Sequence, residues 1–220
     1  MKINIDLHVH TKYSKCAILN PDEIEPLALK RGIDAVAITD HNTIAGALEV
    51  KNHAKKIKVI IGEEIKTTKG EIIGYFLNEQ IPPFLTPEET IKEIKRQGGL
   101  VSVPHPFDRL RSSRLEAETL EKILPNLDMI EIFNSRDILT GQDFGLIEKA
   151  YQMGAVPISA SDAHLSVEVG KSYLSIEDFE TAEDFLENIK KSQHVKRKSP
   201  FWVHLVTKAL KFYKKKGGNT

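Results

Sequence analysis

The first eleven residues, MKINIDLHVHT, join a strand pattern to a pair of histidines. Ile3, Ile5 and Leu7 alternate with more polar residues, which predicts a β-strand. His8 and His10 follow two positions apart, so in an extended chain both side chains point to the same side. An apolar strand that ends in potential metal ligands is a pattern that recurs along the rest of the chain.

Strand and helix patterns alternate almost to the end of the sequence. Continuous apolar strands separated by helices predict a parallel sheet that is covered on both faces. About seven such units in one domain favour a closed barrel over an open doubly wound sheet, although periodicity alone allows both. The further strands are expected at 34–39, 59–62, 71–77, 100–103, 129–133 and 156–160, with helices at 21–31, 43–55, 87–98, 115–124 and 141–153.

The composition is that of a globular protein. The chain has 220 residues, 40% of them hydrophobic and 28% charged, which suits one sizeable core. Its single cysteine, Cys16, excludes an intrachain disulfide and fits a reducing compartment. No apolar run reaches the roughly 18 residues of a membrane span, and the N-terminal stretch has no signal-peptide pattern. We therefore expect a cytoplasmic protein with no membrane span.

The net charge of zero hides an asymmetry. Residues 188–220 carry ten Lys or Arg and no acidic residue, which leaves 21 basic and 31 acidic groups in residues 1–187. An acidic body with clustered histidines can hold cations, and a basic tail can dock on that body or on phosphate-rich partners.

The C-terminal segment is predicted to be separate from the barrel domain. We expect a catalytic domain at 1–192, followed by a basic connector and an amphipathic helix at 193–220, with 195–200 as the connector itself. Trp202, Val206, Ala209 and Tyr213 share one face of that helix, which predicts packing on the body or on a second subunit of a homo-oligomer. Contact with RNA or a membrane surface is the alternative. Removal of 199–220 is expected to spare the chemistry.

Further potential ligands lie where the later strands end. Sites in parallel α/β folds form at the C-terminal ends of the strands, so these side chains should converge. Imidazole and carboxylate donors without a thiolate cluster suit Zn, Mn or Fe, and seven donors exceed the needs of one ion. The sequence therefore predicts two or three divalent metal ions held by His8, His10, His41, Glu64, His105, Asp162 and His164.

Six motifs, in this order, resemble those of the polymerase and histidinol phosphatase (PHP) domain superfamily. They are DLHVHT (6–11), TDHNT (39–43), GEE (62–64), VPHPF (103–107), EIFNSR (131–136) and SASDAH (159–164), and the resemblance covers about residues 3–175. It implies a distorted (β/α)7 barrel and metal-dependent phosphoester hydrolysis.

The resemblance also implies how the ligands are grouped. His8, His10, Glu64 and Asp162 are similar to the ligands of one metal, with Glu64 as the bridge because the family motif is Gly-x-Glu. His41 and His164 are similar to ligands of a second ion, and His105 with Glu64 to part of a third.

Two positions depart from the family pattern. Many members have an Asp or His shortly after the serine of the first motif, where this chain has Lys15-Cys16. Cys16 is either a thiolate ligand or, as we expect, an ordinary loop residue. Many members have a His where Glu71 stands, and Glu71 is either a ligand or a surface glutamate. Full occupancy by three ions and a preference for Zn over Mn depend on these two positions.

The remaining site residues are expected to act on protons and phosphate. Asp40 is expected to orient a metal ligand or to transfer a proton, and Asp6 is similar. Arg136 is our first choice for binding phosphate, with Asn134 beside it, because Asn134-Ser135-Arg136 resembles a substrate-side motif of one subgroup. Arg109 is the second choice, and the nearby Arg111 and Arg114 are expected to be solvated.

The leading interpretation is hydrolysis of phosphomonoesters or short nucleotide phosphoesters by a metal-activated water. Because fold does not determine function, an amidohydrolase-like hydrolase is an alternative, and a non-enzymatic, metal-dependent RNA-binding module is another.

Overall fold

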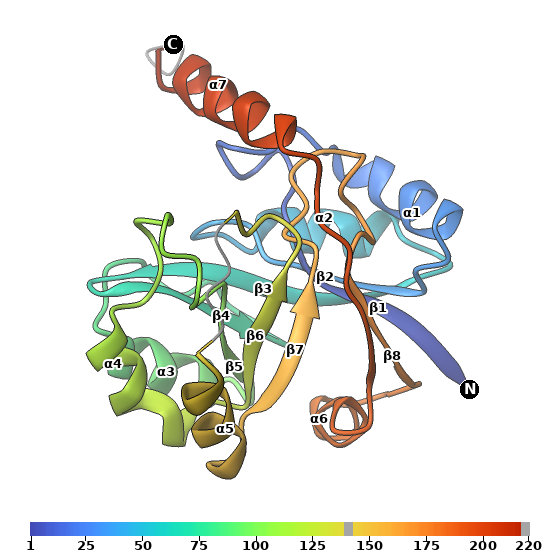
Figure 1. The fold of residues 1–220 in the computed structure, drawn as a ribbon. Coiled ribbons are helices and arrows are strands. Elements are labelled where there is room, and N and C mark those ends of the chain that lie inside the picture. The colour runs from blue at the N-terminus through green and yellow to red at the C-terminus, as the bar shows by residue number, and fades with distance from the viewer. Residues whose placement is uncertain (139–142, 217–220) are drawn as a thin grey trace.

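The computed structural model describes residues 1–138 and 143–216. Nine strands form one sheet in the order β7-β6-β5-β4-β3-β2-β1-β8-β9 (Figure 1). The strands are β1 Lys2–Val9, β2 Ala35–Ile38, β3 Lys58–Thr67, β4 Gly70–Tyr75, β5 Leu100–Val103, β6 Met129–Asn134, β7 Val156–Ala160, β8 Tyr173–Glu177 and β9 Gln193–Val195. The α-helices within the described ranges are α1 Pro21–Lys30, α2 Ala45–His53, α3 Pro87–Arg96, α4 Ala117–Ile123, α5 Phe144–Gln152, α6 Ala182–Ile189 and α7 Trp202–Lys216.

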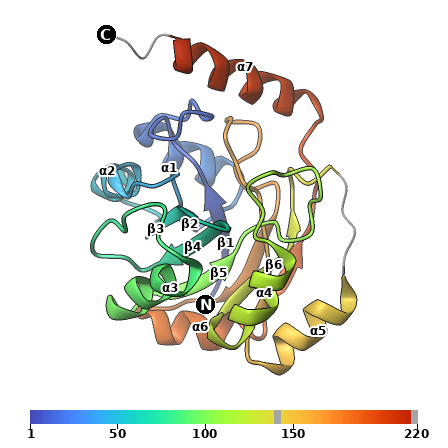
Figure 2. The ribbon, with the colours of Figure 1, turned by 90° about the vertical axis from the view of Figure 1, so that its left-hand side faces the viewer.

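The sheet curves until β1 and the segment after β7 meet. Val9 pairs with Ala163 in a parallel bridge, and the Ala163 amide donates to the carbonyl oxygen of His8. The result is an α/β fold with a nearly closed, barrel-like sheet, as the sequence predicted. Figure 2 shows α7 lying across one end of this barrel.

The prediction of a wholly parallel sheet was wrong. β1–β2, β2–β3, β5–β6 and β6–β7 are parallel, but β4 is antiparallel to both of its neighbours. The cause is the connection: β3 extends to Thr67 and β4 begins at Gly70, so only two residues join them. A two-residue loop makes a hairpin, because a parallel crossover needs a dozen residues or more.

Residues 170–195 contain three elements that the sequence analysis did not predict. β8 pairs antiparallel to β1 and to β9, and α6 follows β8. Phe185 of α6 packs with Phe76 and Phe179, at ring-centroid distances of 5.5 and 5.1 Å, in the cluster that also holds Ile5 and Leu7. These elements therefore belong to the apolar core of the barrel.

A register shift in β1 decides where its histidines point. Ile3, Ile5 and Leu7 belong to one core cluster, whereas Val9 belongs to another. The pairing of β1 with β2 is irregular between Asp6 and Val9. A bulge moves the following side chains to the opposite face of a strand, because side chains alternate with a period of two. The shift therefore turns the side chains of His8 and His10 towards the other candidate ligands.

Helix α7 packs on the barrel through a face other than the predicted one. Val203 and Thr207 are buried, whereas Trp202 is 48% and Tyr213 78% exposed. The connector sets this orientation, because the Ser199 amide donates to the carbonyl oxygen of Ser135 at 2.8 Å. The predicted packing of the Trp202 face on the body was therefore wrong. Residues 141–142 and 217–220, included in the predicted helical segments, lie outside the described residues.

The helix starts follow local signals. Thr86 caps α3 by accepting from the Glu89 amide, and the Glu89 carboxylate accepts in return from the Thr86 amide at 2.9 Å. At α1 the Glu23 carboxylate accepts from the Asn20 amide at 2.9 Å. Within the described ranges no helix has both the length and the apolar character to cross a membrane.

Candidate metal centre

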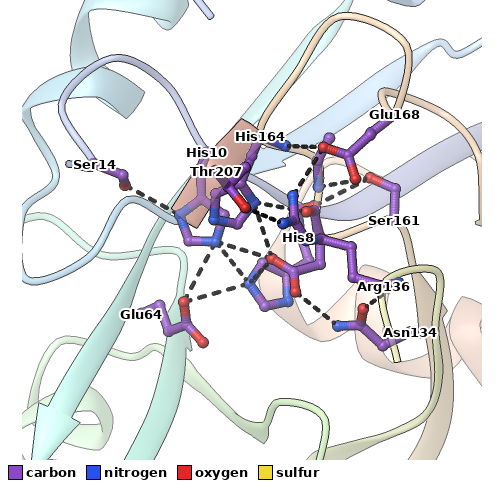
Figure 3. A network of polar contacts seen from close by, with 12 residues as sticks. His8, His10, Ser14, Glu64, Asn134, Arg136, Ser161, His164, Glu168 and Thr207 are labelled. Atoms are coloured by element: carbon purple, nitrogen blue, oxygen red, sulfur yellow. Dashed lines mark hydrogen bonds and ion pairs between the residues drawn. The ribbon is translucent and has the colours of Figure 1, made fainter. Parts of the chain in front are cut away.

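The seven predicted ligands meet at the C-terminal ends of the barrel strands. Six of them are buried, and the side chain of His41 is 26% exposed. Figure 3 shows His8, His10, Glu64 and His164 grouped with side chains from β6 and α7. Three sets have ligand atoms within 4.8 Å of one another: His8, His10 and Asp162; His10, His41 and His164; and His41, Glu64 and Glu71.

The Nε2 atoms of His8 and His10 face each other, and the Nδ1 atom of each ring has a partner behind it. The His8 Nδ1–H donates to Glu131 at 2.6 Å. Ser14 Oγ gives its proton to Asp40 at 2.6 Å and so accepts from His10 Nδ1–H at 3.1 Å. With Nδ1 as the donor, the lone pair of each ring in its neutral form lies on Nε2, and the two Nε2 atoms are 3.0 Å apart. Fixed Nδ1 partners of this kind are typical of metal-binding histidines.

Glu64 lies at the centre of the cluster. Its Oε2 is 3.3 Å from His10 Nε2 and 2.9 Å from His41 Nδ1, and its Oε1 is 3.1 Å from His105 Nε2. A parallel bridge between His41 and Glu64 places the two residues opposite each other. Glu64 thus turns one oxygen towards His10 and His41 and the other towards His105, and a carboxylate in this position could bridge two metal ions.

Glu71 belongs to this cluster, and Cys16 lies beside it. The Glu71 carboxylate is buried, 3.9 Å from His41 and from His105, so the surface alternative was wrong. Burial and the nearby Glu64 raise the pKa of Glu71. Cys16 is buried, and its thiol contributes to raising the pKa of His41.

Two candidate ligands hold backbone conformations that side chains rarely adopt. φ is +34° at His105 and +55° at Asp162, in the left-handed region. Such strain costs on the order of 1–3 kcal/mol and persists where the surroundings impose it, commonly at functional sites. Here the His105 amide donates to Glu131 and the Asp162 carbonyl oxygen accepts from His164 Nδ1, so both turns are fixed by the cluster itself.

Asp40 is held behind the ligands. It is fully buried and accepts from the Thr11 amide, from the Thr11 hydroxyl and from Ser14. A Cβ on Gly46 would lie 2.1 Å from Asp40 Oδ2, so only glycine fits at this helix start. Ser14 links Asp40 to His10, because its hydroxyl contacts both side chains. Asp6 is likewise buried and accepts from the amides of Ser161 and Gly170.

The positions of Arg109, Arg111 and Arg136 differ from those that the sequence led us to expect. Arg109 is exposed. Arg111, expected to be solvated, contacts Asp162 at 2.6 Å, so that expectation was wrong. Arg136 is buried and uses its guanidinium on Glu168 at 2.9 Å and on the Thr207 hydroxyl at 2.8 Å.

Asn134 is committed to contacts within the protein. Its Nδ2 donates to Glu131 at 3.0 Å and to Asp162 at 3.3 Å, and its Oδ1 accepts from the Arg136 amide. The amide thus holds two carboxylates of the centre in place.

The electrostatics of the cluster favour cations. Burial alone would lower the pKa of His8 and of His41, yet nearby carboxylates, Glu131 and Glu64 foremost, raise both well above the usual value. Burial lowers the pKa of His10 to about 4, so this ring is a neutral ligand near pH 7. Burial would raise the pKa of Asp162, but Arg111 and His8 hold it well below its usual value. The centre thus keeps Glu64 and Asp162 ionised and stabilises positive charge.

A cavity of about 750 Å³ opens over the cluster. Its lining includes His41, Glu71, Asp162 and His164 from the centre, Arg111 and Arg136 beside it, and His204, Thr207, Lys208 and Lys211 from α7. Ligand pockets commonly measure about 300–1,000 Å³, so this cavity accepts a molecule larger than a phosphate group.

A family model that describes the PHP domain matches residues 6–198. This chain belongs to the PHP domain family. The resemblance that the six motifs indicated is thereby confirmed.

Two uncharacterized proteins of Methanocaldococcus jannaschii are similar to this PHP chain. One is 46% identical over 144 residues, which cover 59% of this chain and 81% of the relative. The other is 35% identical over 179 residues, which cover 80% of this chain and 71% of the relative.

Among solved structures, the PHP chain resembles a two-domain protein of Bacteroides vulgatus that contains a predicted PHP-like metal-dependent phosphoesterase. The TM-score is 0.68 at 16% identity, over 90% of this chain and 65% of that one. This chain therefore spans just under two thirds of that protein, and at this identity the likeness establishes the fold.

Sequence reasoning missed several residues of the PHP site. Glu131 fixes the His8 ring, and a charged residue within the apolar strand 129–133 was a signal that could have revealed it. Glu168 accepts from the amides of His164 and Leu165, but it lies outside every motif. The α7 residues that line the cavity had no signal beyond their charge.

Proposed function

We propose that this PHP chain hydrolyses phosphoesters with two or three divalent ions held by His8, His10, His41, Glu64, His105, Asp162 and His164. The observation that carries the proposal is the pair of His8 and His10 Nε2 atoms 3.0 Å apart, each ring held through its Nδ1, with the ionised carboxylates of Glu64 and Asp162 around them. A donor set of imidazole and carboxylate fits Zn, Mn or Fe, and Glu71 offers a further oxygen.

The bound ions would supply a Lewis acid and activate the attacking water. Protein side chains would bind the phosphate and orient the ligands. Arg111, beside Asp162, presents a guanidinium to the same cavity, where it can bind phosphate oxygens. We assign to Asp40 the role of orienting His10 through Ser14, because it is buried behind the ligands rather than exposed to the cavity.

Arg136 and Asn134 act as positioning residues in this proposal. Arg136 holds Glu168, and Glu168 accepts from the backbone amide of His164. Asn134 holds Glu131 and Asp162. Arg109, exposed on the loop, has no part in it.

Metal analysis combined with a substrate panel tests the proposal. After reconstitution with Mn and Zn, we expect at least two equivalents of metal and turnover of p-nitrophenyl phosphates, but not of matched esters or amides. His53 is the control histidine, because it lies on α2 and contacts Glu49 at 3.9 Å, so His53→Ala should leave metal content and turnover unchanged. Less than one equivalent of metal would reject the centre. Turnover of amides but not of phosphates would favour an amidohydrolase.

A further inference from the structure

Helix α7 presents lysines to the cavity that holds the candidate metal centre. Lys208 and Lys211 are three residues apart, so they lie on one side of the helix, and both line the cavity. Figure 1 shows β6 and β7 running towards the end of the barrel where α7 lies, and Figure 2 shows α7 across that end. The helix thus forms part of the wall of the cavity.

The orientation of α7 is held from the barrel. The Thr207 hydroxyl accepts from Arg136 Nη2 at 2.8 Å, and Val203, one turn earlier, is fully buried. Lys208 follows Thr207 directly, and Lys211 lies one turn beyond it. These contacts hold α7 on the barrel and thereby set the positions of Lys208 and Lys211.

The cavity has two regions of opposite charge. The deep region holds the carboxylates Glu71 and Asp162, and there Arg111 is already paired with Asp162 and Arg136 with Glu168. Three lysines also line the cavity: Lys66 from β3, which is partly buried, and Lys208 and Lys211 from α7, which are exposed. Among residues 1–138 and 143–216, no carboxylate forms an ion pair with any of these three lysines.

We propose that Lys208 and Lys211 bind a second phosphate of the substrate, apart from the phosphate that lies at the metal centre. This rests on the proposed function, because the first phosphate is the one that is hydrolysed. In the proposed function the metal ions would neutralise the first phosphate, with Arg111 beside it. Lys208 and Lys211, which form no ion pair with a carboxylate in the described residues, then call for a further negative group. The substrate class is therefore a molecule with two phosphates, and the cavity of about 750 Å³ has room for it.

Binding of synthetic phosphates to the metal-loaded protein tests this by calorimetry. The probes are propanediol, hexanediol and decanediol bisphosphates, each compared with the alkyl monophosphate of the same length. We expect at least one bisphosphate to bind about tenfold more tightly than its monophosphate, since a charge-assisted contact is gained. The readout is the ratio of the two dissociation constants, which cancels effects on the first phosphate.

Two double variants provide the comparison. Lys208→Ala/Lys211→Ala should bring the ratio close to one. Lys51→Ala/Lys92→Ala removes the same charge from exposed positions of α2 and α3 and should keep the wild-type ratio. The proposal is overturned if no bisphosphate in the series binds more tightly, or if the gain survives in Lys208→Ala/Lys211→Ala. Failure of the proposed function would appear separately, as absent turnover of phosphoesters by the wild type.

Discussion

The segment from β1 to β7 and the segment from β8 to α7 contribute to the same cavity in different ways. All seven candidate ligands belong to the first segment or to the loop after β7, whereas the second segment supplies His204, Thr207, Lys208 and Lys211. The first segment is acidic and rich in histidine, and the second is basic. The comparison teaches that the two segments bring opposite charge to one cavity, which is what the proposed binding of cations by the first and of an anion by the second requires.

Loss of a ligand in the first segment should have the largest effect. We expect Asp162→Ala and His10→Ala each to lower phosphoester turnover at least about 10³-fold, because the bound ions supply the activated water. Steady-state kinetics on metal-reconstituted protein measures this, with circular dichroism as a check of the fold. Near-normal turnover in either variant would remove that residue from the proposed centre.

The guanidinium nearest the ligands should come next. We expect Arg111→Ala to lower kcat/KM about 10²-fold, as for loss of one preorganised donor to a reacting group. Arg109→Ala is the matched control from the same loop, and it should stay close to wild type because its side chain is exposed. Equal losses in the two variants would mean that the loop charge as a whole, and not Arg111, binds phosphate.

Deletion of residues 199–220 tests whether the second segment takes part at all. From the sequence alone the deletion is expected to spare the chemistry, but the cavity lining now predicts a fall of about tenfold or more in kcat/KM, since misplaced binding groups cost rate. The loss of buried Val203 should also lower stability by roughly 1.5–3 kcal/mol. Kinetics and thermal unfolding measure the two effects. Unchanged kinetics with lowered stability would make α7 a purely structural element.

Thr207 tests the link between the two segments. Thr207→Val keeps the shape of the side chain but removes the acceptor of Arg136 Nη2, and Arg136 in turn holds Glu168 beside the His164 amide. We expect metal affinity to fall, by up to about tenfold, as for loss of a partner behind a metal ligand. Competition with a chelator measures this affinity. Thr119→Val on α4, where no such link exists in the described structure, should bind metal like the wild type.

The smallest effect on turnover is expected at Glu63, the neighbour of Glu64 that points away from the cluster. Glu63 is fully buried and accepts from the Ile81 amide at 2.9 Å, and burial raises its pKa to about 7. A raised carboxyl pKa means that the native state binds the proton more tightly. The free energy of unfolding should therefore fall as the pH rises from about 4.5 to about 7 and level off above that.

Glu63→Gln should remove that part of the pH dependence. The difference in unfolding free energy between variant and wild type should grow across this interval by at most roughly 3.5 kcal/mol, since one pKa unit corresponds to about 1.4 kcal/mol. Denaturant unfolding at several pH values measures it. A constant difference across the interval would show that Glu63 does not titrate there.

Local patterns in the sequence determined a large part of this protein. The strands that carry the candidate ligands, the capped starts of α1 and α3, and the choice of candidate ligands follow from features spanning a few residues each. Such features are decided by neighbours in the chain, through side-chain alternation, capping and strand ends, so they can be read without a fold. The six motifs added the family, and with it the barrel.

Only the tertiary structure decided how distant parts meet. Arg111 and not Arg109 reaches Asp162 because of the path of a loop, and no spacing in the sequence records that path. The bulge in β1 arises from its pairing with β2, and the orientation of α7 from the contacts of Thr207 with Arg136 and of Ser199 with Ser135. Each of these depends on packing between residues far apart in the chain, where the outcome is set by the sum of many weak contacts.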